Sequence, residues 1–213
     1  MKDKHQRTDL DMTGKKPRQF VSFDWAMKKL LRSKANFDVL EGFLSELLKD
    51  DIVIEEILES EGNQDAQLDK YNRVDLLVKD RLGQRIVIEV QYEREADYFQ
   101  RMLYGSSKII SETLGSGEPY AEVKKVVSVN IVYFDLGQGG DYIYLGRTDF
   151  EGMHVHDKLE LSDYQKDLFQ CDGVSDVFPD YYILKINNFD DVAKDGLDEW
   201  IYFLKNEEIK GDF

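Results

Sequence analysis

The sequence predicts an α/β fold in which helices flank a mixed β-sheet. Two observations lead to this prediction. Some segments carry apolar residues at helical spacing, whereas other, shorter segments alternate or run continuously apolar as strands do. The two kinds of segment follow one another as helix, strand, strand, strand, helix, strand and then further elements. With 213 residues and 42% hydrophobic content, the chain is long enough to bury one core, so we expect a single domain over residues 20–213.

The helical pattern is clearest in the first quarter of the chain. Leu40, Leu44 and Leu47 recur at three- and four-residue spacing, which is typical of one apolar helix face. Asn36 is a plausible N-cap for this helix, and a shorter helix is expected over residues 25–31. Two further helices are expected over residues 96–114 and 190–207.

Short apolar runs predict the strands. They are expected at residues 52–58, in the two arms of the segment 73–92, and at 125–135, 142–150 and 181–186. An acidic loop is expected at residues 59–71. The glycine clusters GSG and GQGG lack the spacing of a phosphate-binding loop, so we interpret them as turns.

Charge and composition exclude several classes of function. The net charge of −15 counts against a general nucleic-acid-binding protein, which usually shows a basic surface. Residues 1–19 are the exception, because six Lys or Arg outnumber three Asp, and we expect a disordered basic tail there. The single Cys171 and three histidines cannot supply a disulfide or a closed Cys/His zinc site. No stretch is apolar enough to suggest a signal peptide or a membrane helix, so we expect a cytoplasmic protein.

Two carboxylates stand inside the apolar runs of RVDLLVKDRLGQRIVIEVQY, residues 73–92. If the turn is centred near Leu82, antiparallel pairing places Asp75 opposite Glu89 on one face, and a four-residue loop would shift the pairing by one residue. Opposed Cβ atoms lie about 4.5–5.5 Å apart, so the two charges repel and lose hydration. A hard cation such as Mg²⁺, a basic partner (Arg73 or Arg85) or a shared proton could compensate.

These residues and those that follow them carry a resemblance. Asp75, a hairpin, Glu89-Val90-Gln91 and then a helix with YFQR at 98–101 and Tyr104 resemble the PD-(D/E)XK nuclease superfamily, and within it the Rpn-type recombination-promoting nucleases, or putative transposases. The likeness extends to FDWAMKKLL, GFLSELL, YYILKINNF and LDEWIYFLK. It therefore covers about residues 20–210 of the chain.

The resemblance implies a restriction-endonuclease-like fold with a C-terminal strand and helix extension. It also implies that Asp75 and Glu89 ligate Mg²⁺, or Mn²⁺ or Ca²⁺, for cleavage of DNA phosphodiesters. The third position of the motif, usually Lys, is Gln91, which cannot act as a base but whose carbonyl could ligate metal or orient water. We therefore include Gln91 in the catalytic set.

Two helices supply further candidates. Superfamily members often add an acidic residue from the helix before the first strand, and Glu41 shares a stripe with Leu44 there. Arg101, Tyr104 and Lys108 lie at i, i+3 and i+7 on the helix after the hairpin. They either contact DNA, with Arg101 clamping a phosphate oxygen, or form a solvated face.

The resulting hypothesis is a metal-dependent DNA endonuclease from a recombination or mobile-element context, with DNA as its partner. Cleavage of both strands would suggest a homodimer. The alternative hypothesis is a catalytically silent protein of the same fold that acts as a protein-binding or regulatory module.

Overall fold

A computed structural model describes residues 37–58 and 75–206 of the chain. The basic tail at 1–19, the expected helix at 25–31, the expected N-cap Asn36 of the next helix and the acidic loop at 59–71 lie outside the described residues.

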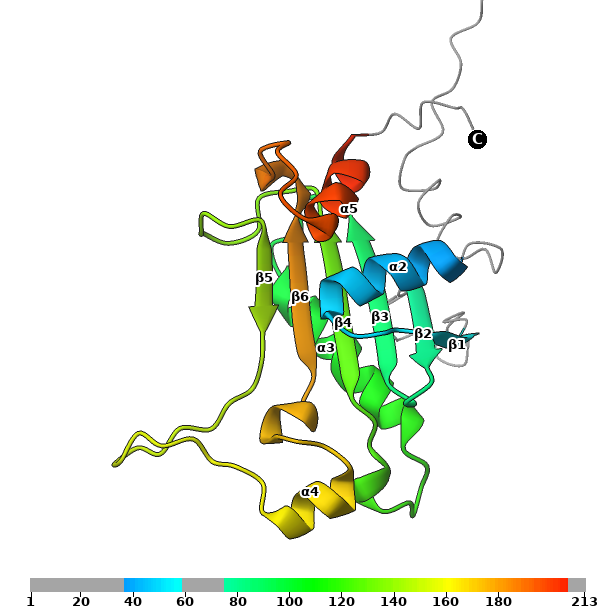
Figure 1. Cartoon of the computed structure of the whole chain (residues 1–213), viewed down its shortest axis with the longest axis vertical. Helices are drawn as coiled ribbons and strands as arrows, with labels where there is room; N and C mark the ends of the chain where they lie inside the picture. The colour runs from blue at the N-terminus through cyan, green and yellow to red at the C-terminus, as the bar shows by residue number, and fades with distance from the viewer. Residues whose placement is uncertain (1–36, 59–74, 207–213) are drawn as a thin grey trace, which may run out of the picture.

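Six strands form one mixed sheet in the order β1-β2-β3-β4-β6-β5 (Figure 1). The parallel pairs are β3 with β4 and β4 with β6, and the other neighbours are antiparallel. The strands are β1 (Ile54–Leu58), β2 (Leu76–Asp80), β3 (Arg85–Gln91), β4 (Val126–Val132), β5 (Ile143–Gly146) and β6 (Asp180–Lys185). The predicted mixed α/β fold is confirmed.

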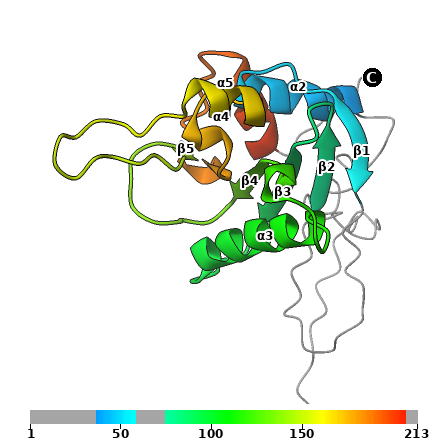
Figure 2. The ribbon, with the colours of Figure 1, turned by 90° about the horizontal axis from the view of Figure 1, so that it is seen from below.

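Helices lie on both faces of the sheet. The α-helices are α2 (Phe37–Leu48), α3 (Tyr98–Thr113), α4 (Asp163–Phe169) and α5 (Gly196–Lys205), and the short 3-10 turns are η2 (Tyr120–Glu122), η3 (Val174–Asp176) and η4 (Ile186–Asn188). Helices α2 and α5 cover one face, and α3 covers the other (Figure 2). A small pocket lined by Glu89 of β3, Asn130 of β4 and Arg101 of α3 lies between the sheet and α3.

Strand alternation decides which side chains meet which helix. Ile86 and Ile88 join the core under α2 and α5, whereas Val87 packs with Ile109 of α3. All seven residues of β4 are buried, as expected for a parallel strand covered on both faces. The polar positions in this strand are therefore forced into the interior.

The hairpin has the predicted register. Leu76 pairs with Ile88 and Lys79 with Arg85, so the turn is centred on residue 82. Asp80 fixes this turn, because its Oδ1 accepts hydrogen bonds from the backbone N–H groups of residues 82 and 84 at 2.9 and 2.8 Å. Gly83 adopts a φ of 81°, which suits glycine.

Some boundaries differ from the sequence prediction. The strand expected at 142–150 ends at Gly146, which pairs with Tyr181. The pairing is antiparallel and β6 begins at Asp180. Residues 148–150 therefore extend beyond the first residue of β6 and have no partner in that strand. The last helix starts at Gly196 rather than at 190, since Asp195 caps it by accepting the N–H of residue 198 at 2.9 Å.

Helix α4 was not expected from the sequence. Ser162 and Gln165 form a capping box at its start, and the helix has no buried residue. The Ser162-x-x-Gln165 pattern of this capping box is visible in the sequence and was a usable signal for the start of the helix.

Candidate active site

Asp75 and Glu89 lie close together at one end of the hairpin. Continuing the register of β2 and β3 by one residue places Asp75 opposite Glu89. The Oδ2 atom of Asp75 accepts the backbone N–H of Val90 at 2.8 Å, which ties this carboxylate to the end of β3. Alternation puts Glu89 on the face that α3 covers, with Val87.

A guanidinium bridges Glu89 to a second glutamate. Arg101 Nη2 lies 3.2 Å from Glu89 Oε2, and Arg101 Nη1 lies 2.9 Å from Glu95 Oε2. The three side chains are 26%, 13% and 31% exposed, respectively. Among the described ion pairs, the basic partner of Glu89 therefore comes from α3 and not from Arg85; Arg73 lies outside the described residues.

Arg101 is held in its charged form. Burial works against the charge, but Glu89 and then Glu95 outweigh it and raise the pKa of Arg101 above its ordinary value. The guanidinium also lies 6.0 Å from the ring centroid of Tyr98, within the range of a cation–π contact.

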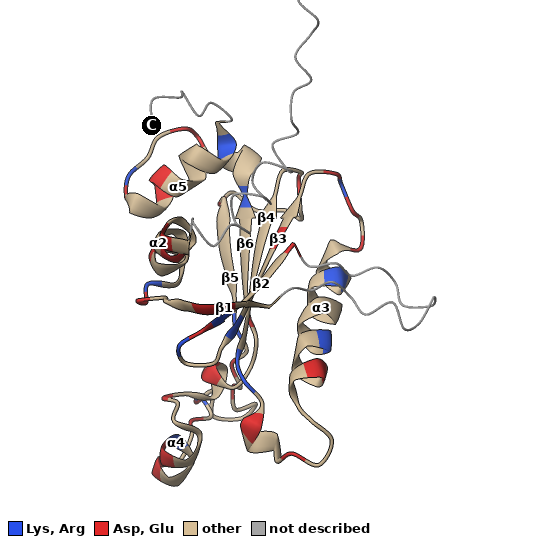
Figure 3. Ribbon diagram, turned by 90° about the vertical axis from the view of Figure 1, so that its right-hand side faces the viewer, with Lys and Arg blue, Asp and Glu red and all other residues tan. Residues whose placement is uncertain are grey.

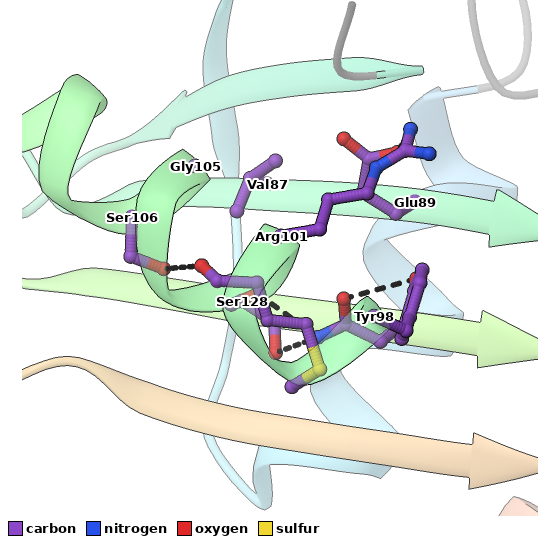
Figure 4. Close-up of a pocket in the computed structure, with 9 residues that line it drawn as sticks. Val87, Glu89, Tyr98, Arg101, Gly105, Ser106 and Ser128 are labelled. Atoms are coloured by element: carbon purple, nitrogen blue, oxygen red, sulfur yellow. Dashed lines mark hydrogen bonds and ion pairs between the residues drawn. The ribbon is translucent and has the colours of Figure 1, made fainter. Parts of the chain in front are cut away.

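Buried polar side chains form the floor of a small pocket beside Glu89 (Figure 4). Tyr98 Oη donates to Asn130 Oδ1 at 3.2 Å, and Asn130 Nδ2 donates to Ser128 Oγ at 2.9 Å. Burial, and then the negative charge of Glu89, raise the pKa of Tyr98, so its hydroxyl stays protonated. Sequence analysis missed this network, although Ser128 and Asn130 are polar residues inside an apolar strand, which was a usable signal.

Gln91 lies at the end of β3, two residues beyond Glu89. Its Nε2 donates to the backbone carbonyl of Glu93 at 3.0 Å. This bond occupies the amide N–H side and leaves the carbonyl oxygen as the group with ligand chemistry.

The structure does not bring Glu41 to this pair of carboxylates. Glu41 belongs to α2, on the other face of the sheet, and its Oε1 accepts the backbone N–H of Ile54 at 2.7 Å. Ile54 pairs with Asp80, whereas Asp75 precedes the opposite end of β2. Glu41 therefore anchors the start of β1.

Tyr104 and Lys108 follow Arg101 along α3. Tyr104 is 46% exposed, and Lys108 Nζ lies 3.6 Å from Glu112 Oε1. Both are accessible on the same helix as Arg101, but Arg101 alone of the three contacts Glu89 in the described ion pairs. Figure 3 shows the basic and acidic positions along α3.

Comparison with protein families now identifies the fold. The sequence model of the PD-(D/E)XK nuclease family transposases matches residues 21–166. The chain belongs to this family. The family usually uses a divalent metal, and its match covers the hairpin, α3 and β4. Neither a curated protein nor a solved structure matches the chain.

The donor atoms at the hairpin suit the metal that the family implies. Asp75 and Glu89 offer carboxylate oxygens and Gln91 an amide oxygen, which are the ligands that hard cations prefer. The described residues hold no cluster of three or more His, Cys, Asp or Glu side chains able to bind an ion. An ion here would take its remaining ligands from water or phosphate oxygens, as Mg²⁺ commonly does.

In the described part of the chain, no helix is both long and apolar enough to span a bilayer.

Proposed function

We propose that this protein is a metal-dependent DNA endonuclease that acts in the cytoplasm in a recombination or mobile-element context. The observation that carries the proposal is the register that sets Asp75 opposite Glu89 beside Arg101 of α3, in a chain of a nuclease family. Asp75 and Glu89 would hold Mg²⁺, or Mn²⁺ or Ca²⁺ in its place.

The bound metal would supply charge neutralisation at the phosphate and a lower pKa for an attacking water. The chain's own residues would do the rest. Gln91 would orient the water through its carbonyl oxygen, and Arg101 would bind a non-bridging phosphate oxygen. Tyr104 and Lys108 would contact the strand further along α3. Cutting both strands would suggest that two copies act together, so we include a homodimer in the proposal.

The test is cleavage of supercoiled plasmid in Mg²⁺ or Mn²⁺. Asp75→Asn and Glu89→Gln keep the side-chain shape but remove the charge, and each should lower the rate about a hundredfold or more. Glu55→Gln is the matched control, because Glu55 is a carboxylate of the same sheet whose partner is Lys79, at 2.6 Å. Cleavage by both site variants at the wild-type rate would refute the proposal, as would its absence in folded wild-type protein with either metal.

The second candidate is a catalytically silent protein of the same fold, because the candidate metal-binding side chains make contacts with other residues of the chain. Arg101 occupies an oxygen of Glu89, and Gln91 bonds the backbone of Glu93. Such a protein would act by binding other proteins. Titration calorimetry with Mn²⁺ separates the two candidates, since a silent scaffold need not bind the ion at the hairpin.

A further inference from the structure

Arg101 stands where a cation would approach Glu89. Its Nη2 is 3.2 Å from Glu89 Oε2, and Glu89 is 13% exposed. A guanidinium and a divalent ion cannot share this oxygen at close range without repulsion. Arg101 must therefore move away from Glu89 if an ion is to use that oxygen.

The geometry of the Arg101 contacts with Glu89 and Glu95 favours such a movement. Each carboxylate receives one hydrogen bond from a different nitrogen, and the shorter one, 2.9 Å, goes to Glu95. Arg101 therefore lacks the two parallel bonds to Glu89 that make a bidentate pair strong. Its Nε is buried and has no hydrogen-bond acceptor among the described residues, so the present pose does not saturate its donors.

Glu95 and Tyr98 would keep Arg101 in place after it leaves Glu89. Glu95 precedes α3 and bonds Nη1, and the ring of Tyr98 lies 6.0 Å from the guanidinium carbon. Release of Glu89 would thus free Nη2 while the side chain stays beside the hairpin.

We propose that Glu95 is a positioning residue that holds Arg101 away from Glu89 when a divalent cation binds there, so that Nη2 can turn to a phosphate oxygen. This inference rests on the proposed function, because it requires an ion at Asp75 and Glu89. Arg101 is then a counter-ion of the metal-free site and a phosphate ligand of the loaded site. Glu95 acts only through Arg101 and touches neither metal nor DNA.

The experiment is titration calorimetry with Mn²⁺ alone, on the full chain without DNA. Arg101→Met removes the competing charge and should tighten the dissociation constant roughly threefold to tenfold. Glu95→Gln leaves Glu89 as the sole carboxylate partner of Arg101 and should weaken binding by a similar factor. Once Arg101 is replaced by Met, the further change Glu95→Gln should not alter Mn²⁺ binding. The double variant should therefore have the same dissociation constant as Arg101→Met alone.

Two controls accompany the titration. Lys79→Met removes one positive charge of similar exposure, 32% against 26% for Arg101, at the other end of the hairpin, and should leave the dissociation constant unchanged. Thermal unfolding followed by circular dichroism establishes that each variant is folded.

The outcomes are distinct. Weaker binding by Arg101→Met would overturn the inference, because Arg101 would then support the ion site. A loss caused by Glu95→Gln in the Arg101→Met background would also overturn it, since Glu95 would be a metal ligand. Both results leave the proposed function intact. Absence of binding in folded wild type and Arg101→Met alike, or binding unaffected by Asp75→Asn, would instead remove the proposed function and this inference with it.

Discussion

Two ionic clusters lie at different places in the sheet, and their charges are arranged in opposite ways. At the end of β3, two carboxylates, Glu89 and Glu95, share the single cation Arg101. At the start of β6, the buried carboxylate of Asp180 is shared by two cations, with Lys125 Nζ at 3.0 Å and Arg147 Nε at 3.3 Å, and the more exposed Asp176 lies 3.8 Å from Lys125.

The charge balance and the burial of the two clusters distinguish a structural ion pair from a site that could bind a cation. The side chain of Asp180 is 4% exposed, and two cations contact it, so that with Asp176 the described ion pairs balance in charge. The Glu89 cluster keeps an excess of negative charge in its described ion pairs and is partly open to solvent. Removal of one partner from a cluster of the first kind is expected to destabilise the fold, because it leaves a buried charge unpaired, whereas a cluster of the second kind is expected to attract a cation.

The largest expected effect is on stability at the Asp180 cluster. Asp180→Asn keeps the shape but leaves the mostly buried Lys125 without its nearest carboxylate, and it should lower the free energy of unfolding by about 3 kcal/mol. Urea denaturation measures this quantity. Asp176→Asn is the control, because Asp176 is 41% exposed and 3.8 Å from Lys125, and it should cost less than about 1 kcal/mol. Equal losses of unfolding free energy in Asp180→Asn and Asp176→Asn would contradict the structural role assigned to Asp180.

A smaller loss of stability is expected when the carboxylate of Glu89 is neutralised in the same way. Glu89→Gln leaves Arg101 paired to Glu95 at 2.9 Å, so Arg101 keeps a carboxylate partner, and the free energy of unfolding should change by less than about 1 kcal/mol. The same urea experiment, without added metal, tests this. A loss as large as that for Asp180→Asn would mean that Glu89 is a structural residue like Asp180.

The smallest expected effect is that of pH on the stability that either cluster contributes. Burial opposes the charges of Arg101 and Arg147, but Glu89 and Asp180 respectively outweigh it and raise the pKa of each arginine above its ordinary value. A base with a raised pKa stabilises the fold below its unfolded pKa and loses this contribution only as pH rises through the folded pKa.

The stability difference between wild type and Asp180→Asn should therefore stay constant between about pH 6 and about pH 9. Urea titrations at several pH values measure it. A slope of about 1.4 kcal/mol per pH unit would reveal uptake of one proton on folding in only one of the two proteins.

The hairpin shows what could be predicted from sequence. The alternation within its two strands is visible in the residues, and a turn centred near Leu82 pairs Asp75 with Glu89, whereas a four-residue loop would shift the pairing by one; the structure has the turn centred on Leu82. The placement of Asp75 opposite Glu89 followed from that register alone. Helix periodicity likewise gave α2 and α3 to within a few residues.

The partners of Glu89 were harder to predict because they depend on tertiary packing. Glu95 lies between the hairpin and α3, where no periodic pattern applies, and its role appears only once α3 packs on the sheet and Arg101 reaches back. Glu41 illustrates the opposite case, since its stripe on α2 was visible but the end of the sheet that it meets was not. The functional roles of these residues stay predictions.

The position of β6 has a consequence for shortened forms of the protein. The family match ends at residue 166, yet β6 starts at Asp180 and lies between β4 and β5. A fragment cut at residue 166 would expose the backbone edge of the apolar strand β4 and strand β5 without its neighbour. Unpaired apolar edges recruit other chains, so such a fragment should form insoluble aggregates.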